Sequence, residues 1–245
     1  MNRNKQQNGF LLKFNRLTAV AAPVTLLIQF SIMLWWSWRK WPDILVDFGG
    51  ALYIPWQISS GKILYKDIVY GLGPLSSYIN ASLFYLFGTS YTVIIIANIV
   101  FLALFLTVLY LLLEKVCSRL AAFLSCGVVI SVFSFSQYKF TGNYNFISPY
   151  SHEATHGILL SLLMIYHLWR FTANKNKHNL ILAGSIFGLI FLTKVDILIS
   201  AFMVVCFFFI LSWLYYHDFR STIKSAGIFF AFSGIPVFFF FVYCF

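Results

Sequence analysis

The sequence predicts an all-α polytopic membrane protein of about seven transmembrane helices, with two interfacial amphipathic helices in the first outer loop. Three observations predict this class. Of the 245 residues, 60% are hydrophobic and only 10% are charged, whereas a soluble domain has about 25% charged residues. The apolar residues gather in stretches of about 20, the length that crosses a bilayer. Phenylalanine and tyrosine supply 29 and 14 residues, which suits lipid-facing helices with aromatic belts.

The first apolar stretch runs from about Leu17 to Trp38. Basic residues precede it, as in a signal peptide, but the stretch is long and ends in several tryptophans. It also lacks a small-x-small cleavage site before Arg39. We therefore predict an uncleaved membrane anchor.

The segment from about 39 to 90 is predicted to be the first outer loop and to contain two amphipathic helices. Asp47 can cap the first helix, and Gly61 can end it. Pro74 begins the second helix, at a position where proline is tolerated, and Gly88 ends it. Apolar residues recur at helical spacing in each helix, at Phe48, Leu52, Pro55 and Trp56 and then at Leu75, Ile79, Leu83 and Leu86. Such helices lie in the membrane interface.

Further apolar stretches predict spans at about 91–113, 118–137, 155–171, 179–194, 197–216 and 226–245. If the N-terminus is inside, the inner segments hold eleven basic residues and the outer segments six, which is the positive-inside pattern. This pattern accounts for most of the formal net charge of +10, so membrane lipids are predicted partners and nucleic acid is not. We predict one transmembrane module, residues 1–245, in a bacterial inner (plasma) membrane with a cytoplasmic N-terminus.

Five of the seven acidic residues fall on the predicted outer side, in breaks between apolar stretches. They are Asp43, Asp47, Asp67, Glu153 and Asp196. A polytopic protein needs no carboxylates on that face to fold, so several together would make a site for a cation, for proton transfer or for both. Simpler interpretations are a helix cap for Asp47 and a solvated loop charge for Asp67.

The richest polar stretch covers residues 151–157 and reads S-H-E-A-T-H-G. His152 and His156 are four residues apart, so they would share one face of a helix. The stretch formally matches the H-E-x-x-H zinc motif, and an intramembrane metalloprotease is therefore one alternative. Polar residues at a helix end, without a catalytic role, are another.

Lys194 and Asp196 interrupt two apolar stretches near the predicted outer side. One interpretation is a simple pair of neighbouring charges in the interface. In the other, Lys194 contacts a phosphate and Asp196 holds Lys194 in place.

The order of these motifs resembles a known family. An acid follows the first span, and the later motifs are G-K-I-L-Y-K-D at 61–67, G-P-L-S-S-Y at 73–78, L-F-Y-L-F-G at 83–88, N-Y-N-F at 143–146 and L-T-K at 192–194. This set resembles the GT-C membrane glycosyltransferases, specifically the family-39-like group of protein mannosyltransferases and aminoarabinose transferases. Members of that group are usually longer, so we expect this chain to be the N-terminal module.

The resemblance implies transfer of a sugar from a polyprenyl-phosphate-linked donor to a lipid, glycan or protein acceptor at the outer face of the membrane. It implies that Asp47 is the catalytic acid or base. The candidate substrate-binding residues are Asp67, Tyr65, His152, Glu153 and Lys194.

The resemblance also implies that a divalent cation can take part. Some related enzymes place an acid and a lysine just before the proline of the second loop helix, where this chain has Gly71 and Leu72. His152 and Glu153 are therefore the metal candidates.

Two other classes of protein compete with an enzyme. A transporter or lipid flippase would place charges inside its spans and contain internal repeats. Here the acids gather at one interface and no repeat is visible, which favours an enzyme. A non-catalytic scaffold is the third class.

Overall fold

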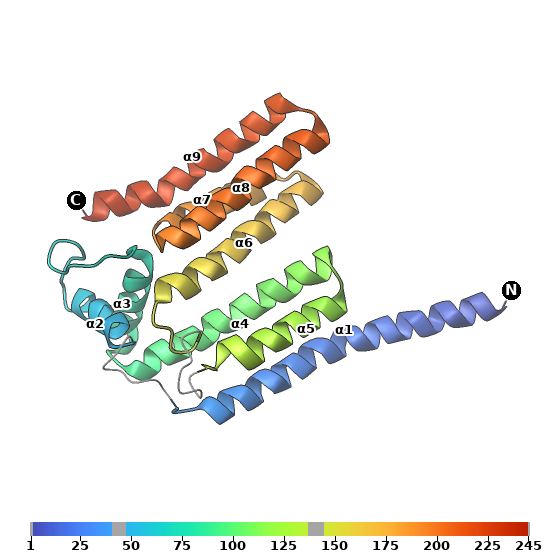
Figure 1. The fold of residues 1–245 in the computed structure, drawn as a ribbon, viewed down its shortest axis with the longest axis horizontal. Helices are drawn as coiled ribbons and strands as arrows, with labels where there is room; N and C mark the ends of the chain where they lie inside the picture. The colour runs from blue at the N-terminus through green and yellow to red at the C-terminus, as the bar shows by residue number, and fades with distance from the viewer. Residues whose placement is uncertain (1, 41–47, 137–144, 245) are drawn as a thin grey trace. The chain divides into compact units, whose positions relative to one another are not determined.

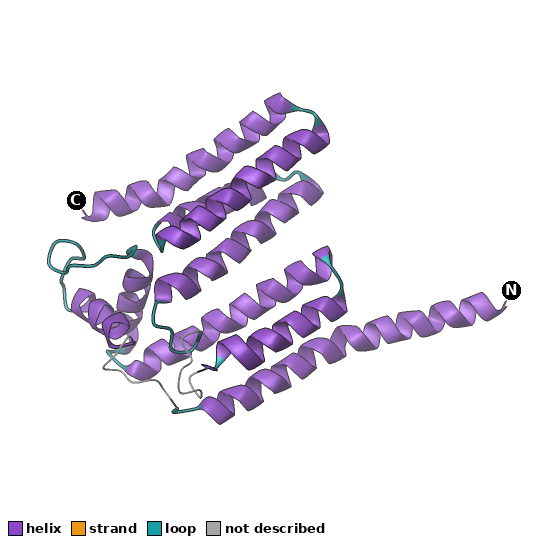
Figure 2. Ribbon diagram, viewed as in Figure 1, coloured by secondary structure: helices purple, strands orange, loops and turns teal. Residues whose placement is uncertain are grey.

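The computed structural model describes residues 2–40, 48–136 and 145–244, with side chains from residue 19 to residue 243 of those ranges. The described residues form helices joined by loops and contain no strand (Figure 2), which confirms the predicted all-α class. The chain divides into two compact units, one of residues 1–42 with 106–147 and the other of residues 43–105 with 148–245. Figure 1 labels the helices along the chain.

The first unit joins the N-terminal helix to three later helical segments. Its elements are α1 (Asn2–Ser37), the second part of α4 (Tyr91–Val116), α5 (Arg119–Val128) and the π-helical segment η2 (Val129–Ser134). The Gln29 side chain of α1 donates hydrogen bonds to the Gly127 carbonyl oxygen at 3.0 Å and to Ser131 Oγ at 2.6 Å. A polar residue inside an apolar helix therefore finds its partners on the neighbouring segment, as a lipid environment requires.

The second unit contains the two loop helices and a group of four longer helices. Its elements are α2 (Gly49–Ser59), α3 (Leu75–Phe87), the first part of α4, α6 (His152–Asn174), α7 (Lys177–Phe191), α8 (Val195–Tyr216) and α9 (Phe219–Cys244). Helix α7 packs against both α6 and α9, and α8 contacts all three (Figure 1). Fully buried side chains such as Met164, Leu180 and Phe229 form the core of this group.

Two glycines of α7 allow α9 to approach closely. A Cβ atom added at Gly184 would lie 2.3 Å from the Phe229 carbonyl oxygen, and one at Gly188 would lie 2.1 Å from that of Ser233. The glycines are one helical turn apart and form a small-x-x-x-small surface, which brings backbones together where lipid supplies no hydrophobic driving force. The α7–α9 packing therefore depends on the absence of side chains at these positions.

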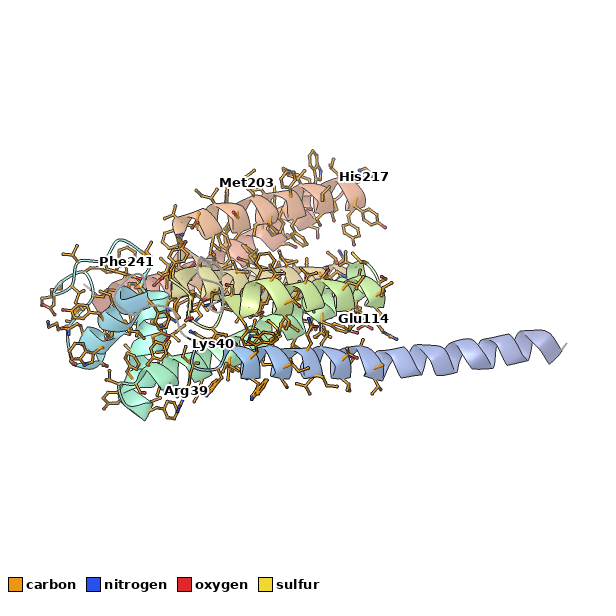
Figure 3. All side chains as sticks on the ribbon, turned by 60° about the horizontal axis from the view of Figure 1, so that its bottom comes forward. Arg39, Lys40, Glu114, Met203, His217 and Phe241 are labelled. Atoms are coloured by element: carbon orange, nitrogen blue, oxygen red, sulfur yellow. The ribbon has the colours of Figure 1, made fainter. Side chains whose placement is uncertain are left out.

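Four of the described helical stretches are long and apolar enough to cross a membrane, namely Ala19–Ser37, Tyr91–Val116, Val195–Tyr216 and Phe219–Tyr243. They match the spans predicted at 17–38, 91–113, 197–216 and 226–245. The count of seven is not confirmed. Residues 119–134 and 177–191 form apolar but shorter helices, and α6 is long but carries a polar first turn. On α8 the side chain of Met203 stands out from the ribbon (Figure 3), and Met203 and Leu211 are 51% and 61% exposed.

The two predicted helices of the first loop are present as α2 and α3. Gly88 ends α3 with φ +85°, and Gly61 follows α2 with φ +96°, so both glycines stop their helices as expected. The N-cap position of α2 belongs to Phe48, which has no side chain that could cap. Asp47, the predicted cap, lies outside the described residues.

Helix α3 buries its polar face. Its buried residues are Ser76, Ser77, Asn80, Ala81 and Phe84. The predicted apolar stripe of Leu75, Ile79, Leu83 and Leu86 is only partly covered, and Leu86 is 68% exposed. This arrangement suits a helix whose outer face meets lipid, because its polar groups must then find partners inside the protein.

We expect Gly188→Ala to destabilise the α6–α9 group. The added Cβ meets backbone atoms, so α9 must shift, and overpacking of this kind costs about 1–3 kcal/mol. Thermal unfolding in detergent should show a lower midpoint than the wild type. The matched control is Gly234→Ala on α9, where a Cβ would have no atom within 4 Å; equal midpoints for the two variants would contradict this explanation of the packing.

Candidate functional site

The first turn of α6 lies at the centre of a buried polar cluster in the second unit. His152, Glu153 and His156 are 2%, 3% and 3% exposed. Ser151, in an extended conformation, occupies the N-cap position, and Glu153 lies in the first turn, where a carboxylate is favoured by the helix dipole. The sequence therefore begins a helix here and places three ionisable side chains at its start.

The Glu153 carboxyl group is held by two hydroxyl groups. Tyr70, from the first loop, donates a hydrogen bond to Oε1, and Ser151 Oγ donates to Oε2 at 3.0 Å. Burial, and next the charge of Glu153, raise the pKa of the Tyr70 hydroxyl well above its ordinary value. Tyr70 therefore remains a proton donor across the physiological range, and the buried carboxyl group has a permanent partner.

The two histidines share one face of α6, as predicted, with ring centroids 5.8 Å apart. His152 Nε2 lies 3.1 Å from Asn98 Nδ2 of α4, and His156 Nδ1 lies 3.0 Å from Ser76 Oγ of α3. Phe101 packs on the His156 ring with centroids 4.4 Å apart. Two different helices thus fix the orientation of the two rings.

His152 is a neutral histidine. Burial, and next the neighbouring His156, lower its pKa to about 3. With the Asn98 amide nitrogen as the donor, His152 Nε2 is the acceptor, and a neutral His152 ring then carries its proton on Nδ1. His152 Nδ1, His156 Nε2 and Asn80 Oδ1 are buried and have no hydrogen-bond partner among the described residues.

The G-P-L motif of the first loop docks on the turn between α7 and α8. The Gly73 amide donates to the Thr193 carbonyl oxygen at 2.7 Å, and the Leu75 amide donates to that of Leu192 at 3.0 Å. A Cβ atom at Gly73 would lie 2.1 Å from the Thr193 oxygen. Only glycine permits this approach, and it joins the G-P-L and L-T-K motifs, which are more than a hundred residues apart.

Tyr65 and Asp67 make contacts inside the first loop. The Tyr65 hydroxyl donates to the Leu72 carbonyl oxygen at 2.6 Å, and Tyr65 has a φ of +69°. Asp67 Oδ2 accepts a hydrogen bond from the Ile63 amide at 2.8 Å. These contacts hold the loop in shape, and substrate binding by either residue stays a prediction.

Lys194 lies just before α8, at the turn on which the first loop docks. Its Nζ is 3.4 Å from Asp196 Oδ2 and 3.5 Å from the Tyr150 hydroxyl. The pairing of Lys194 with Asp196 is therefore present, as both sequence interpretations required. A phosphate contact stays a prediction.

Asp47 and Asp43 lie outside the described residues. The residue that follows Asp47, Phe48, is 2% exposed. Its ring packs 5.2 Å from that of Tyr91 and 5.9 Å from that of His152, measured between centroids. The chain next to Asp47 is thus anchored on the polar cluster.

The described residues alone do not fit a divalent cation. No three of their His, Cys, Asp or Glu side chains lie together in a way that could hold a metal ion. Mg²⁺ and Ca²⁺ need several oxygen ligands, and both carboxyl oxygens of Glu153 already accept hydrogen bonds. A cation at His152 and Glu153 stays a prediction.

Sequence reasoning missed several members of the cluster, namely Tyr70, Ser76, Asn80 and Asn98. Two signals pointed to them. Asn98 is a polar residue inside an otherwise apolar span, which is a mark of function or of interhelical bonding. Ser76 and Asn80 are one helical turn apart and so share a face of α3. Tyr70 carried no local signal.

The fold and the site define an all-helical membrane protein in which the first loop is docked on a buried polar cluster at one end of a helix group. A family model described as dolichyl-phosphate-mannose-protein mannosyltransferase matches residues 72–240. The chain therefore belongs to this family and is a membrane glycosyltransferase of the GT-C type, as its motif order indicated. The match begins after Asp47, Tyr65, Asp67 and Tyr70. Comparison with curated proteins and with solved structures found no match.

We expect Tyr70→Phe to destabilise the docked first loop. The change removes a hydroxyl that the buried Glu153 requires, and an unsatisfied buried acceptor costs about 1–3 kcal/mol. The free energy of unfolding in detergent should fall by this amount, whereas Tyr85→Phe, at a tyrosine that is 80% exposed, should change it by less than about 0.5 kcal/mol. In a Glu153→Gln background the Tyr70→Phe cost should shrink; an unchanged cost would mean that the two side chains are not coupled.

Proposed function

We propose that this chain transfers a sugar from a polyprenyl-phosphate-linked donor to an acceptor hydroxyl at the outer face of a bacterial plasma membrane. The observation that supports this most is the convergence, in one unit, of the G-P-L motif, the start of α6 and the L-T-K turn. The family match covers most of this unit. The family description names dolichyl-phosphate-mannose, a donor of the proposed chemical class.

In this proposal Asp47 is the general base. It is bonded to Phe48, whose ring packs against His152. A carboxylate in a partly dry cleft can accept the proton of the acceptor hydroxyl as the new glycosidic bond forms. The oxygen between sugar and phosphate then takes the bonding electrons, and the lipid phosphate leaves.

Lys194 would stabilise the charge that develops on the leaving phosphate. Its pairing with Asp196 and its contact with Tyr150 restrict its position. The Gly73 amide of the docked loop donates a hydrogen bond to Thr193, the residue before Lys194. The buried hydrogen bonds of Glu153, His152 and His156 would serve to hold the first loop and α6 in register, so that Asp47 and Lys194 face the same substrate. The exposed apolar residues of α3 and α8 would let the lipid tail of the donor approach through the membrane.

We expect Asp47→Asn to remove transfer while leaving the fold intact. Asparagine keeps the size and the hydrogen-bonding shape of aspartate but cannot accept the proton, so the rate should fall about 10²–10⁴-fold. Purified protein in detergent would be assayed with dolichyl-phosphate-mannose as the first donor and a panel of lipid, glycan and peptide acceptors, beside thermal unfolding of the same samples. Asp43→Asn and Asp67→Asn are the controls, with smaller expected losses. Wild-type transfer by Asp47→Asn would exclude Asp47 as the base.

The proposed orientation can be tested separately, because it rests on the distribution of basic residues. With the N-terminus in the cytoplasm, a cysteine introduced at Ser60 should react with a membrane-impermeant maleimide added outside intact cells. A cysteine at Asn174 should react only after the membrane is opened. Labelling from outside at Asn174 but not at Ser60 would reverse the topology and place the whole site on the cytoplasmic side.

A further inference from the structure

A basic groove lies at the other end of the helix group from the polar cluster. It is a cavity of about 750 Å³, open at the surface, at the turns that join α6 to α7 and α8 to α9. Helix α6 has 23 residues, so about 34 Å of helix separates its two ends at 1.5 Å per residue. The groove therefore belongs to neither the polar cluster nor the proposed transfer site.

Three lysines line the groove: Lys175, Lys177 and Lys224. Lys175 ends α6 in a left-handed conformation, and its Nζ lies 3.5 Å from the centroid of the Tyr216 ring at the end of α8. No ion pair involving these three lysines occurs among the described residues. Asp218, the acid closest to the groove in sequence, instead accepts a hydrogen bond from the Ser221 amide. The positive charge of these lysines is thus available to an external anion.

Much of the remaining lining is apolar. One stripe of α9 changes from polar to apolar along its length, with Ser221, Lys224 and Ser225 in the first turns and Ile228, Ala231 and Phe232 further on. Phe171 of α6 faces the same cavity. A ligand that matched this lining would have a negative head and a hydrocarbon tail.

We propose that this groove binds an anionic phospholipid, with its phosphate among Lys175, Lys177 and Lys224 and an acyl chain against Ile228, Ala231 and Phe232. Clustered lysines favour an anionic headgroup over a zwitterionic one, and basic pockets between membrane helices on the cytoplasmic side bind such lipids. The apolar lining favours an intact lipid over a free phosphate ion. The bound lipid would bridge the α6–α7 and α8–α9 turns and so stabilise the helix group.

Thermal unfolding of the purified chain in a zwitterionic detergent tests this proposal. Dioleoyl-phosphatidylglycerol, dioleoyl-phosphatidylcholine and inorganic phosphate would be titrated separately, and the apparent Kd taken from the rise of the unfolding midpoint. We expect saturable stabilisation by the phosphatidylglycerol and little by the other two. Equal stabilisation by phosphatidylcholine would overturn the charge selectivity, and equal stabilisation by phosphate would reduce the groove to an anion site.

Charge variants test whether the lysines of the groove bind the lipid phosphate. Lys177→Gln with Lys224→Gln should weaken phosphatidylglycerol binding about 25-fold, at about fivefold for each lysine. Lys177→Arg with Lys224→Arg should retain binding, because the charge is kept. The matched control is Lys62→Gln with Lys66→Gln, which removes the same charge from exposed positions in the first loop. Equal loss in the control would mean that total charge, and not this groove, attracts the lipid.

A filling variant tests the groove itself without a change of charge. Gly227 lines the cavity, and a Cβ there would have no atom within 4 Å. Gly227→Leu should therefore fold and obstruct the acyl chain, weakening phosphatidylglycerol binding at least fivefold. Gly234→Leu is the control, at a glycine of the same helix that is equally free of neighbours and does not line the groove. Wild-type affinity in Gly227→Leu would overturn the proposal.

Discussion

The hydrogen bond between Tyr70 and the buried carboxyl group of Glu153 is the interaction on which the candidate site depends. It joins the first loop to the start of α6 across 83 residues of sequence. Glu153 is 3% exposed, and burying a carboxyl group is costly unless hydrogen-bond donors contact it. Besides this contact of Tyr70, the first loop contacts the α7–α8 turn, where the Gly73 and Leu75 amides donate backbone hydrogen bonds. The site is therefore held by polar contacts between segments that are remote in sequence.

At the end of the second unit that contains the polar cluster, polar side chains lie inside and apolar ones lie outside. Helix α3 buries Ser76, Ser77 and Asn80 and exposes Leu86. This follows from the membrane, where lipid satisfies apolar surface but offers no hydrogen bonds. The helices further along pack by a different device, in which the α7 glycines bring the α9 backbone close. Polar pairing fixes one end of the unit, and close backbone packing fixes its middle.

The two ends of α6 have different chemistry. At its start, His152, His156 and the hydrogen-bonded Glu153 form a buried polar cluster. At its end, Lys175 and its neighbours carry positive charge over an apolar groove. In our proposals, the start of α6 belongs to the transfer site, and the groove at its end binds a lipid that takes no part in the chemistry.

The sequence by itself determined the helical class, the four apolar stretches long enough to span a membrane, the two loop helices with Gly61 and Gly88 at their ends, and the common face of His152 and His156. These features depend on residues within one or two turns of each other, so hydropathy and spacing are sufficient to predict them. The motif order also identified the family. Only the tertiary structure decided that Tyr70 and Asn98 belong to the site, that Gly73 docks on Thr193, and which face of α3 is buried. These outcomes depend on which surfaces meet after folding, and partners that lie tens of residues apart leave no local pattern in the chain.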